Sequence, residues 1–335
     1  MKEFNIIGTR KYWFIVSGIL FATAVVLLAI FGLKPGIDFT GGSLMEIRFT
    51  GERPTVESVQ NVLADNNLGS VTIQSTADNG YLLRMRYITE DEHQQIIGEI
   101  RNAFQTETEP IPNVTVEEQE GAAVEIVAAD TEETSTVAAV GNRVIEERVE
   151  TIGPAISETL RTRSVQAVVG VVIAIVLFIA YAFRKVSKPV ASWKYGVVAV
   201  VALLHDIVIT MGIFAFLGWW RGVEIDIPFV VALLTILGYS VNDTIIVFDR
   251  VREMLIKRGS SKFAETVNIG LNQTLPRSLN TSFTTLLVLL ALFMFGGDTI
   301  HNFSLALIVG IILGAYSSIF VASPLLVEWS GQKEA

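Results

Sequence analysis

The sequence predicts a membrane all-α six-helix bundle with a small α/β domain inserted between the first and second helix. Six apolar runs are long enough to cross a hydrocarbon core of about 30 Å, which takes about 20 helical residues. The stretch between the first two runs instead carries short patterns typical of strands and amphipathic helices. Charged residues make up 18% of the chain, below the roughly 25% of soluble domains, which agrees with a membrane protein.

The first apolar run follows three basic residues, as a secretory signal does. This run is longer than the usual signal core of about 7–15 residues and lacks an obvious small-residue cleavage site. We therefore expect a retained membrane anchor, with a cleaved signal peptide as the alternative. The expected spans are residues 12–31, 164–183, 195–217, 227–248, 279–295 and 303–326.

The distribution of Lys and Arg predicts how the spans are oriented, because short loops rich in these residues stay in the cytoplasm. The loops after the second and fourth spans are strongly basic, whereas the two short loops on the other side hold only Arg221. Both termini are therefore expected in the cytoplasm and the long inserted segment outside. The expected division is 1–33 for the N-terminus and first span, 34–163 for the inserted domain, 164–326 for the other spans and 327–335 for a cytoplasmic tail.

The inserted segment follows a β-α-β-β-α order, which is typical of a ferredoxin-like domain. Strands are expected at residues 43–50, 71–75 and 81–87, the last two separated by Asp78-Asn79-Gly80, a turn signal. Helices are expected at 55–66 and, starting at Thr89, at 89–104. Residues 105–140 are acidic and poor in aromatic side chains, so we expect a mobile insertion or a weak hairpin. A further helix at 152–163 leads into the second span.

Several function classes are excluded or disfavoured by composition. A net charge of −9 argues against a nucleic-acid partner, which needs a basic surface. The chain has no cysteine, which excludes disulfides and thiolate metal sites, and its three histidines are far apart in sequence. No phosphate-binding loop or local catalytic signature is present. We therefore expect neither an enzyme nor a protein that holds a cofactor or metal.

Ionisable residues inside the predicted spans are the best functional candidates, because burying one in the bilayer costs at least about 2.5–3.5 kcal/mol. Asp243 lies in the fourth span, and helical spacing places Thr235, Tyr239, Asn242, Asp243 and Ile246 near one face of the helix. The functional interpretation is that Asp243 takes up and releases a proton. The structural alternative is that it only forms hydrogen bonds with a neighbouring helix.

Two further charged residues belong to this candidate site. Arg277 begins the fifth span, and Thr281 and Thr285 continue its helical face inward. It is the natural cation for Asp243, or alternatively an anchor that reaches the headgroups. Asp206 lies in the middle of the third span beside His205, and it either relays protons or ties helices together. Gly310 and Gly314 form a GxxxG pattern in the sixth span, followed by Ser317 and Ser318, and predict close helix packing.

Five segments of this chain resemble the SecF family of protein-export membrane subunits. They are GIDFTGG at 36–42, ETIGP at 150–154, LHD at 204–206, GYSVNDTIIVFDR at 238–250 and NQTLPRSLNTS at 272–282. The long string in the fourth span is the most specific of them. Two features depart from the family pattern: Ser278 stands where threonine is usual, and the acidic stretch 105–140 is longer than usual.

The resemblance implies half of a twelve-helix transporter of the RND type in the bacterial inner membrane, with SecD supplying the other half. It implies that proton flow past Asp243 and Arg277 moves the outer domains and helps to draw an exported, unfolded polypeptide outward from the SecYEG channel. Proton-coupling roles would fall on Asp243, Arg277, Asp206, Asn242, Thr281 and Thr285, with membrane lipid as the surroundings. A stand-alone proton-coupled transporter of lipid or drug, and a passive scaffold of the translocon, are the alternatives.

Residues 36–42 also have an interpretation from their own chemistry. Gly41 and Gly42 permit positive φ angles and a tight bend. Together with Gly36 and Asp38 they predict a structural hinge between the membrane part and the inserted domain.

Overall fold

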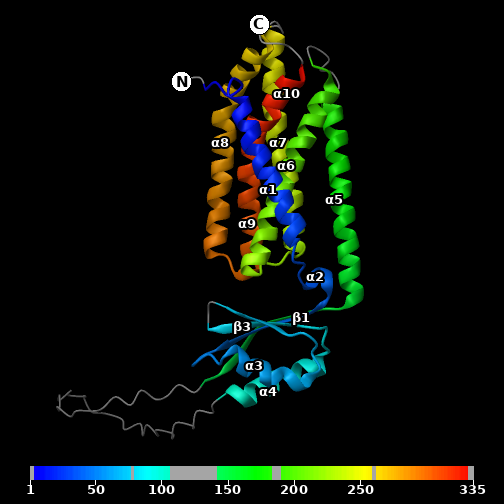
Figure 1. Cartoon of the computed structure of the whole chain (residues 1–335), viewed down its shortest axis with the longest axis vertical. Coiled ribbons are helices and arrows are strands. Elements are labelled where there is room, and N and C mark those ends of the chain that lie inside the picture. Colours follow the sequence, from blue (N-terminus) through cyan, green and yellow to red (C-terminus); the bar gives the residue numbers. More distant parts are fainter. Residues whose placement is uncertain (1–3, 77–78, 106–141, 183–189, 259–261, 331–335) are drawn as a thin grey trace, which may run out of the picture. The chain divides into compact units, whose positions relative to one another are not determined.

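The computed structural model describes residues 4–76, 79–105, 142–182, 190–258 and 262–330 (Figure 1). The contacts divide the chain into two compact units, one formed by residues 1–40 with 155–335 and the other by residues 41–154. The acidic insertion predicted at 105–140 lies outside the described residues, except for Gln105 at the end of a helix.

The membrane unit contains the six predicted spans (Figure 1). The first five are single helices, and the sixth is a continuous run of two α-helices joined by one π-helical turn. This confirms the predicted six-helix class. The elements are α1 (Arg10–Phe31), α5 (Pro154–Ala182), α6 (Ser192–Arg221), α7 (Ile227–Arg258), α8 (Phe263–Phe295) and α9 (Asp298–Ser317) with η2 (Ser318–Ala322) and α10 (Ser323–Ser330).

Helices α7 and α8 extend beyond the predicted spans. Helix α7 continues past residue 248 to Arg258, and α8 begins at Phe263 rather than at residue 279. The added turns are held by packing, since Val251, Phe263 and Val267 are all buried. A hydropathy window ends where charged residues begin, but a helix continues as long as one of its faces is covered.

Small residues bring the central helices close together. A Cβ atom added to Gly310 of α9 would lie 2.9 Å from Cγ2 of Ile236 on α7 and closer still to Cγ1 and Cδ1. At Gly314 it would lie 3.1 Å from the Cβ of Ser240. The GxxxG pattern therefore sets the spacing of α7 and α9, as expected from small residues in membrane helices.

The second unit is a four-stranded antiparallel sheet with two helices. Its elements are β1 (Gly42–Phe49), α3 (Val56–Leu63) with a short 3-10 turn (Ala64–Asn66), β2 (Thr72–Ser75), β3 (Gly80–Met85), α4 (Glu90–Phe104) and β4 (Val144–Ile152). The strand order β2-β3-β1-β4 completes a β-α-β-β-α-β arrangement, which is the ferredoxin-like pattern. Its core is apolar and includes Met45, Ile47, Leu83 and Ile96.

Strand β4 was not predicted from the sequence pattern. It pairs with β1 along its whole length and forms an edge of the sheet. Its sequence, VIEERVETI, holds four charged residues and shows no clean alternation of apolar and polar positions. Only Val144 of this strand is fully buried, so the burial that produces a period-two pattern is weak here.

Helix α4 begins with a reciprocal cap. Thr89 Oγ1 accepts a hydrogen bond from the Glu92 backbone N–H at 3.4 Å, and Glu92 Oε2 accepts one from the Thr89 N–H at 2.9 Å. Arg86 Nη2 also donates to Glu92 Oε1 at 2.6 Å. The hydrogen bond from Arg86, followed by that from Thr89, lowers the pKa of Glu92 to about 2. This confirms Thr89 as the helix start and explains it as a capping box.

Candidate functional site

Asp243 is buried near the middle of α7, and hydrogen bonds connect it to two other elements. Ser278 Oγ of α8 donates to Asp243 Oδ1 at 2.6 Å, and Ser318 Oγ, at the start of η2, donates to Oδ2. Both carboxylate oxygens are therefore engaged, one from the fifth span and one from the sixth. A change in the charge of Asp243 acts directly on the contacts between three spans.

Asp206 forms a second buried carboxylate site on α6, and its side chain is wholly inaccessible. Ser240 Oγ of α7 and Ser317 Oγ of α9 each donate to Asp206 Oδ2 at 2.7 Å. His205 Nδ1 lies 3.0 Å from Asp206 Oδ1. These partners supply the hydrogen bonds that a buried acid requires, so Asp206 ties α6, α7 and α9 together.

The two carboxylates meet the sixth span at consecutive residues. Ser317 binds Asp206, and Ser318 binds Asp243. Ser318 opens the π-helical turn η2, and such turns are rare and occur frequently at functional sites. The sequence reasoning recognised these two serines only as small packing residues. The available signal was a pair of adjacent hydroxyl side chains inside an otherwise apolar span.

Arg277 is exposed on α8, immediately before the serine that binds Asp243. It makes no ion pair with any described residue, Asp243 included. It lines a polar cavity of about 470 Å³ together with Asp249, Arg250 and Glu253 of α7. Arg277 therefore faces a polar cavity beside the site, while serine hydroxyls occupy the two oxygens of Asp243.

The other predicted site residues lie on exposed faces of α7 and α8. Asn242 is exposed, because a helix turns by about 100° per residue and Asp243 points inward. Thr281 Oγ1 donates to the carbonyl of Arg277, and Thr285 Oγ1 to that of Thr281, so both hydroxyls bond within α8. The structure does not bring these three residues into contact with Asp243.

The segment after α1 is tied to the first turn of α7. The Gly36 N–H donates to the carbonyl of Ile225 at 2.7 Å, and the Ile225 N–H donates to that of Lys34 at 2.8 Å. Asp38, in the short helix α2 (Ile37–Thr40), accepts at Oδ2 from the Ile227 N–H at 2.8 Å. A carboxylate at a helix N-terminus is favoured by the helix dipole. Two predicted hinge residues, Gly36 and Asp38, thus attach to the helix that carries Asp243.

The other two predicted hinge residues follow directly. Gly41 has a φ of 71° and Gly42 a φ of 133°, backbone angles that favour glycine. Gly42 is already the first residue of β1. These two glycine conformations lie where the chain passes from one unit to the other.

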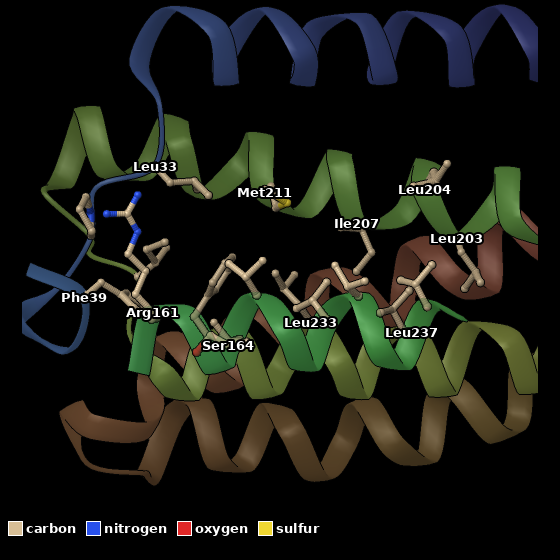
Figure 2. Close-up of a pocket in the computed structure, with 18 of the residues that line it drawn as sticks. Leu33, Phe39, Arg161, Ser164, Leu203, Leu204, Ile207, Met211, Leu233 and Leu237 are labelled. Atoms are coloured by element: carbon tan, nitrogen blue, oxygen red, sulfur yellow. The ribbon is translucent and has the colours of Figure 1, made fainter. Parts of the chain in front are cut away.

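An apolar groove of about 610 Å³ separates α5 from α6 and α7 (Figure 2). Aliphatic side chains such as Leu203, Ile207 and Leu233 line most of its length, and Arg161 and Ser164 lie at one end with Phe39. Arg161 is the only titratable residue among those that line it. The groove therefore offers no site for proton exchange, and in the part of the chain that is described no cluster of His, Asp or Glu could hold a metal.

Comparison with known proteins identifies relatives over nearly the whole chain. Residues 132–332 match the family described as protein export membrane protein SecD/SecF, C-terminal, and residues 26–51 match the SecD/SecF GG motif. Protein translocase subunit SecF of Thermobaculum terrenum is 39% identical over 98% of this chain and 94% of its own length. SecF of Desulfurispirillum indicum is 38% identical, covering 96% and 90%.

The fold has a counterpart among solved structures. The crystal structure of SecDF, a translocon-associated membrane protein from Thermus thermophilus, matches 99% of this chain with a TM-score of 0.74 at 30% identity. The super-membrane-facing form of SecDF matches with a TM-score of 0.62. This chain spans 39% of the SecDF chain, so the SecDF protein contains much that has no counterpart here.

Proposed function

Because the chain belongs to the SecF family of protein translocase subunits, we propose that it works with SecD in protein export, using the proton motive force to promote the late stage of translocation across the bacterial inner membrane. The observation that carries this proposal is the environment of Asp243. Its carboxylate is buried in mid-span, and each oxygen accepts a serine hydroxyl from a different helix.

Proton binding at Asp243 would change these bonds. A carboxylate only accepts hydrogen bonds, whereas a protonated carboxyl group also donates one. The serine that faces the protonated oxygen, Ser278 at Oδ1 or Ser318 at Oδ2, would have to accept a hydrogen bond instead of donating one, and the contact of α7 with α8 or with η2 would change with it. One proton crossing a potential of 100 mV releases about 2.3 kcal/mol, and each unit of pH difference adds about 1.4 kcal/mol. That energy is comparable to the free energy of one or two hydrogen bonds to a charged group.

Exposed polar residues on α7 and α8 support a partner on this face. Asn242, Arg277 and Asn280 are exposed within membrane-spanning helices. Polar side chains at bilayer depth rarely face lipid and are usually covered by other helices or water. SecD is the partner that fits, because the matching SecDF chain holds both parts together. Arg277 would then lie in a hydrated cavity at the interface, close enough to respond to Asp243.

The remaining partners follow from the proposed orientation. With both termini in the cytoplasm, the inserted α/β domain lies outside, where it can meet the exported, unfolded polypeptide as it leaves the SecYEG channel. Apolar side chains exposed on α1 and α5 face membrane lipid. The attachment of residues 36–38 to α7 gives a route by which changes at Asp243 reach this domain.

The test replaces Asp243 with Asn, which keeps the side-chain size but cannot change charge. The variant is assembled with SecD and the SecYEG channel in membrane vesicles, and export is measured with and without an imposed proton gradient. We expect the increase in export caused by the gradient to disappear. The control is Glu265→Gln, which removes an exposed carboxylate from α8, outside the cavity that Arg277 lines.

Each alternative function has its own outcome. Gradient-driven export that stays normal in Asp243→Asn, with the complex assembled, would refute proton coupling at Asp243 and leave a passive scaffold. Proton-driven transport of lipid or drug by the purified chain without SecD would favour a stand-alone transporter.

A further inference from the structure

We infer that His205 and Asp206 form a second proton-exchange site, which binds its proton at His205 Nε2 and communicates with Asp243 through Ser317 and Ser318. The inference rests on the proposed function, since it adds a second site to the same proton-coupled bundle. It goes beyond that function by assigning the exchanging atom and the connection between the two buried acids.

The charge of the pair supplies the first argument. An ionised Asp206 accepts hydrogen bonds only, so the His205 nitrogen at 3.0 Å, Nδ1, must carry a hydrogen. A neutral imidazole then has its lone pair on Nε2, and the buried pair carries one uncompensated negative charge. Binding a proton at Nε2 produces a neutral ion pair, which is far less costly in a dry interior. The His205–Asp206 pair can therefore gain and lose one proton at Nε2.

The surroundings of Nε2 supply the second argument. His205 is buried, and its Nε2 has no hydrogen-bond partner among the described residues. The ring lies between Phe21 of α1 and Tyr316 of α9, with centroid distances of 6.4 and 6.2 Å. The Tyr316 hydroxyl lies 2.8 Å from Ser17 Oγ of α1. The unpaired ring nitrogen thus belongs to a side chain that packs against α1 and α9, and these two helices contribute the Ser17 and Tyr316 hydroxyl groups.

Few other groups compete for this proton. Among the described contacts of the pair, the titratable groups are His205, Asp206 and Tyr316. From α7 the contacting group is the Ser240 hydroxyl, and from α9 it is the Ser317 hydroxyl. Asp243 is reached only through the next serine, Ser318.

The two serines provide the connection, because each hydroxyl has only one hydrogen to donate. Ser317 Oγ lies within hydrogen-bond distance of Asp206 Oδ2 at 2.7 Å and of the Gly314 carbonyl at 3.3 Å. Ser318 Oγ likewise faces Asp243 Oδ2 and, at 3.2 Å, the Ala315 carbonyl. When Asp243 is protonated on Oδ2, its own hydroxyl donates to Ser318, and the Ser318 hydrogen turns to the Ala315 carbonyl. When His205 takes up a proton, Asp206 stays ionised but is paired with an imidazolium, so it holds the Ser317 hydrogen less strongly against the competing Gly314 carbonyl. Both changes act on the turn that precedes η2, so the state of one site alters the other.

Histidine NMR of the full-length chain in lipid nanodiscs tests the site directly. The chain has only three histidines, His93, His205 and His301, so three ring signals are expected. We expect the Nε2 signal of His205 to change from its neutral to its protonated position as the pH is lowered. A His205 ring whose Nε2 stays in one state from pH 5 to pH 9 would overturn the site.

The same signal tests the connection. We expect Asp243→Asn to shift the midpoint of the His205 titration, and Ser318→Ala to remove that shift when combined with it. The control is His301→Asn, which removes a histidine outside both networks. A midpoint that is identical with Asp and with Asn at position 243 would overturn the connection.

An export measurement separates proton exchange from a structural role. His205→Asn retains a side-chain N–H that can donate to Asp206 but cannot take up a proton. We expect this variant to assemble with SecD and to lose gradient-driven export; normal gradient-driven export would overturn the inference. Because the NMR titration measures proton binding without export, a silent His205 combined with an inactive Asp243→Asn would leave the proposed function intact and remove only this inference.

Discussion

Replacing Gly310 with Ala should destabilise the bundle although the change adds one methyl group. The new Cβ would lie 2.9 Å from Cγ2 of Ile236 and closer to two further atoms of that side chain. Ile236 is almost completely buried, and a β-branched side chain in a helix has essentially one χ1 rotamer, so it cannot swing aside. Helices α7 and α9 must therefore move apart.

The expected size follows from two opposing contributions. Overpacking a well-packed core costs about 1–3 kcal/mol, and contact with three atoms of one rigid side chain favours the upper end. Replacing Gly by Ala inside a helix returns about 1 kcal/mol. We therefore expect the free energy of unfolding to fall by about 2 kcal/mol. Separation of α7 from α9 should also weaken the bond from Ser318 to Asp243, so gradient-driven export should fall with it.

The assay is denaturation of the full chain in detergent, followed by the fluorescence of its five tryptophans. Gly238→Ala on α7 is the matched control, because a Cβ there meets nothing within 4 Å. In a chain that already carries Ile236→Ala, the Gly310→Ala change should cost nothing further, since the clashing atoms are gone. The reasoning is refuted if Gly310→Ala costs the same about 2 kcal/mol whether position 236 holds Ile or Ala.

Three further changes have expected outcomes of their own. Asp38→Ala removes the acceptor for the Ile227 N–H and should lower stability by about 0.5–2 kcal/mol, with faster amide exchange in the first turn of α7 measured by mass spectrometry. Glu92→Gln should lower the melting temperature at pH 6, and the difference from the parent should shrink as the pH falls from about 4.5 toward 2. The pKa of Glu92 is lower in the folded chain than in the unfolded chain. Ionised Glu92 therefore stabilises the fold at pH values above its unfolded-state pKa of 4.5, and this stabilisation is lost as the pH falls to its folded-state pKa of about 2. Asn268→Ala removes the acceptor for the N–H groups of residues 6 and 7 and should expose the N-terminal segment to limited proteolysis.

Two of these changes have a control on the same or a neighbouring element. For Glu92, the control is Glu57→Gln in the first turn of α3, which makes no ion pair with a described residue. A pH-independent melting difference for Glu92→Gln would contradict the linkage argument. For Asn268, the control is Asn280→Ala, exposed on the same helix. Equal cleavage of the two variants would show that the hydrogen bonds of Asn268 do not hold the N-terminal segment in place. Unchanged exchange in Asp38→Ala would show that the first turn of α7 is held by other contacts.

The sequence predicted the six spans well, because a run of about 20 apolar residues has few alternatives to a membrane helix. The predicted lengths of α7 and α8 were too short, because Val251 and Val267 keep one face of each added segment buried while charged residues cover the other. Strand β4 escaped prediction for the opposite reason. It is an edge strand with charged residues on both faces, so its place in the sheet is fixed by pairing with β1 and leaves little periodicity.

The sequence predicted the two buried acids of the candidate site but not the serines that bind them. Asp206 and Asp243 stand out because a carboxylate in an apolar span needs a reason. Their partners are serines, which are common as small packing residues and have no distinctive local pattern. Helical spacing also suggested that Asn242 shares a face with Asp243, whereas adjacent residues differ by about 100°. The proton-coupling roles assigned to all six residues stay predictions: Asp243, Arg277, Asp206, Asn242, Thr281 and Thr285.

The attachment of residues 36–38 to α7 has a mechanical consequence. A helix is stiff along its axis, and here the Asp38 carboxylate accepts from the N–H of its first residue, Ile227, while the Gly36 N–H donates to the carbonyl of Ile225, two residues before the helix. Any shift of α7 along its axis must therefore pull on the chain at Gly41 instead of being absorbed by slack in a loop. In the proposed coupling, only residues 38–42 therefore separate the start of α7 from the first strand of the inserted domain.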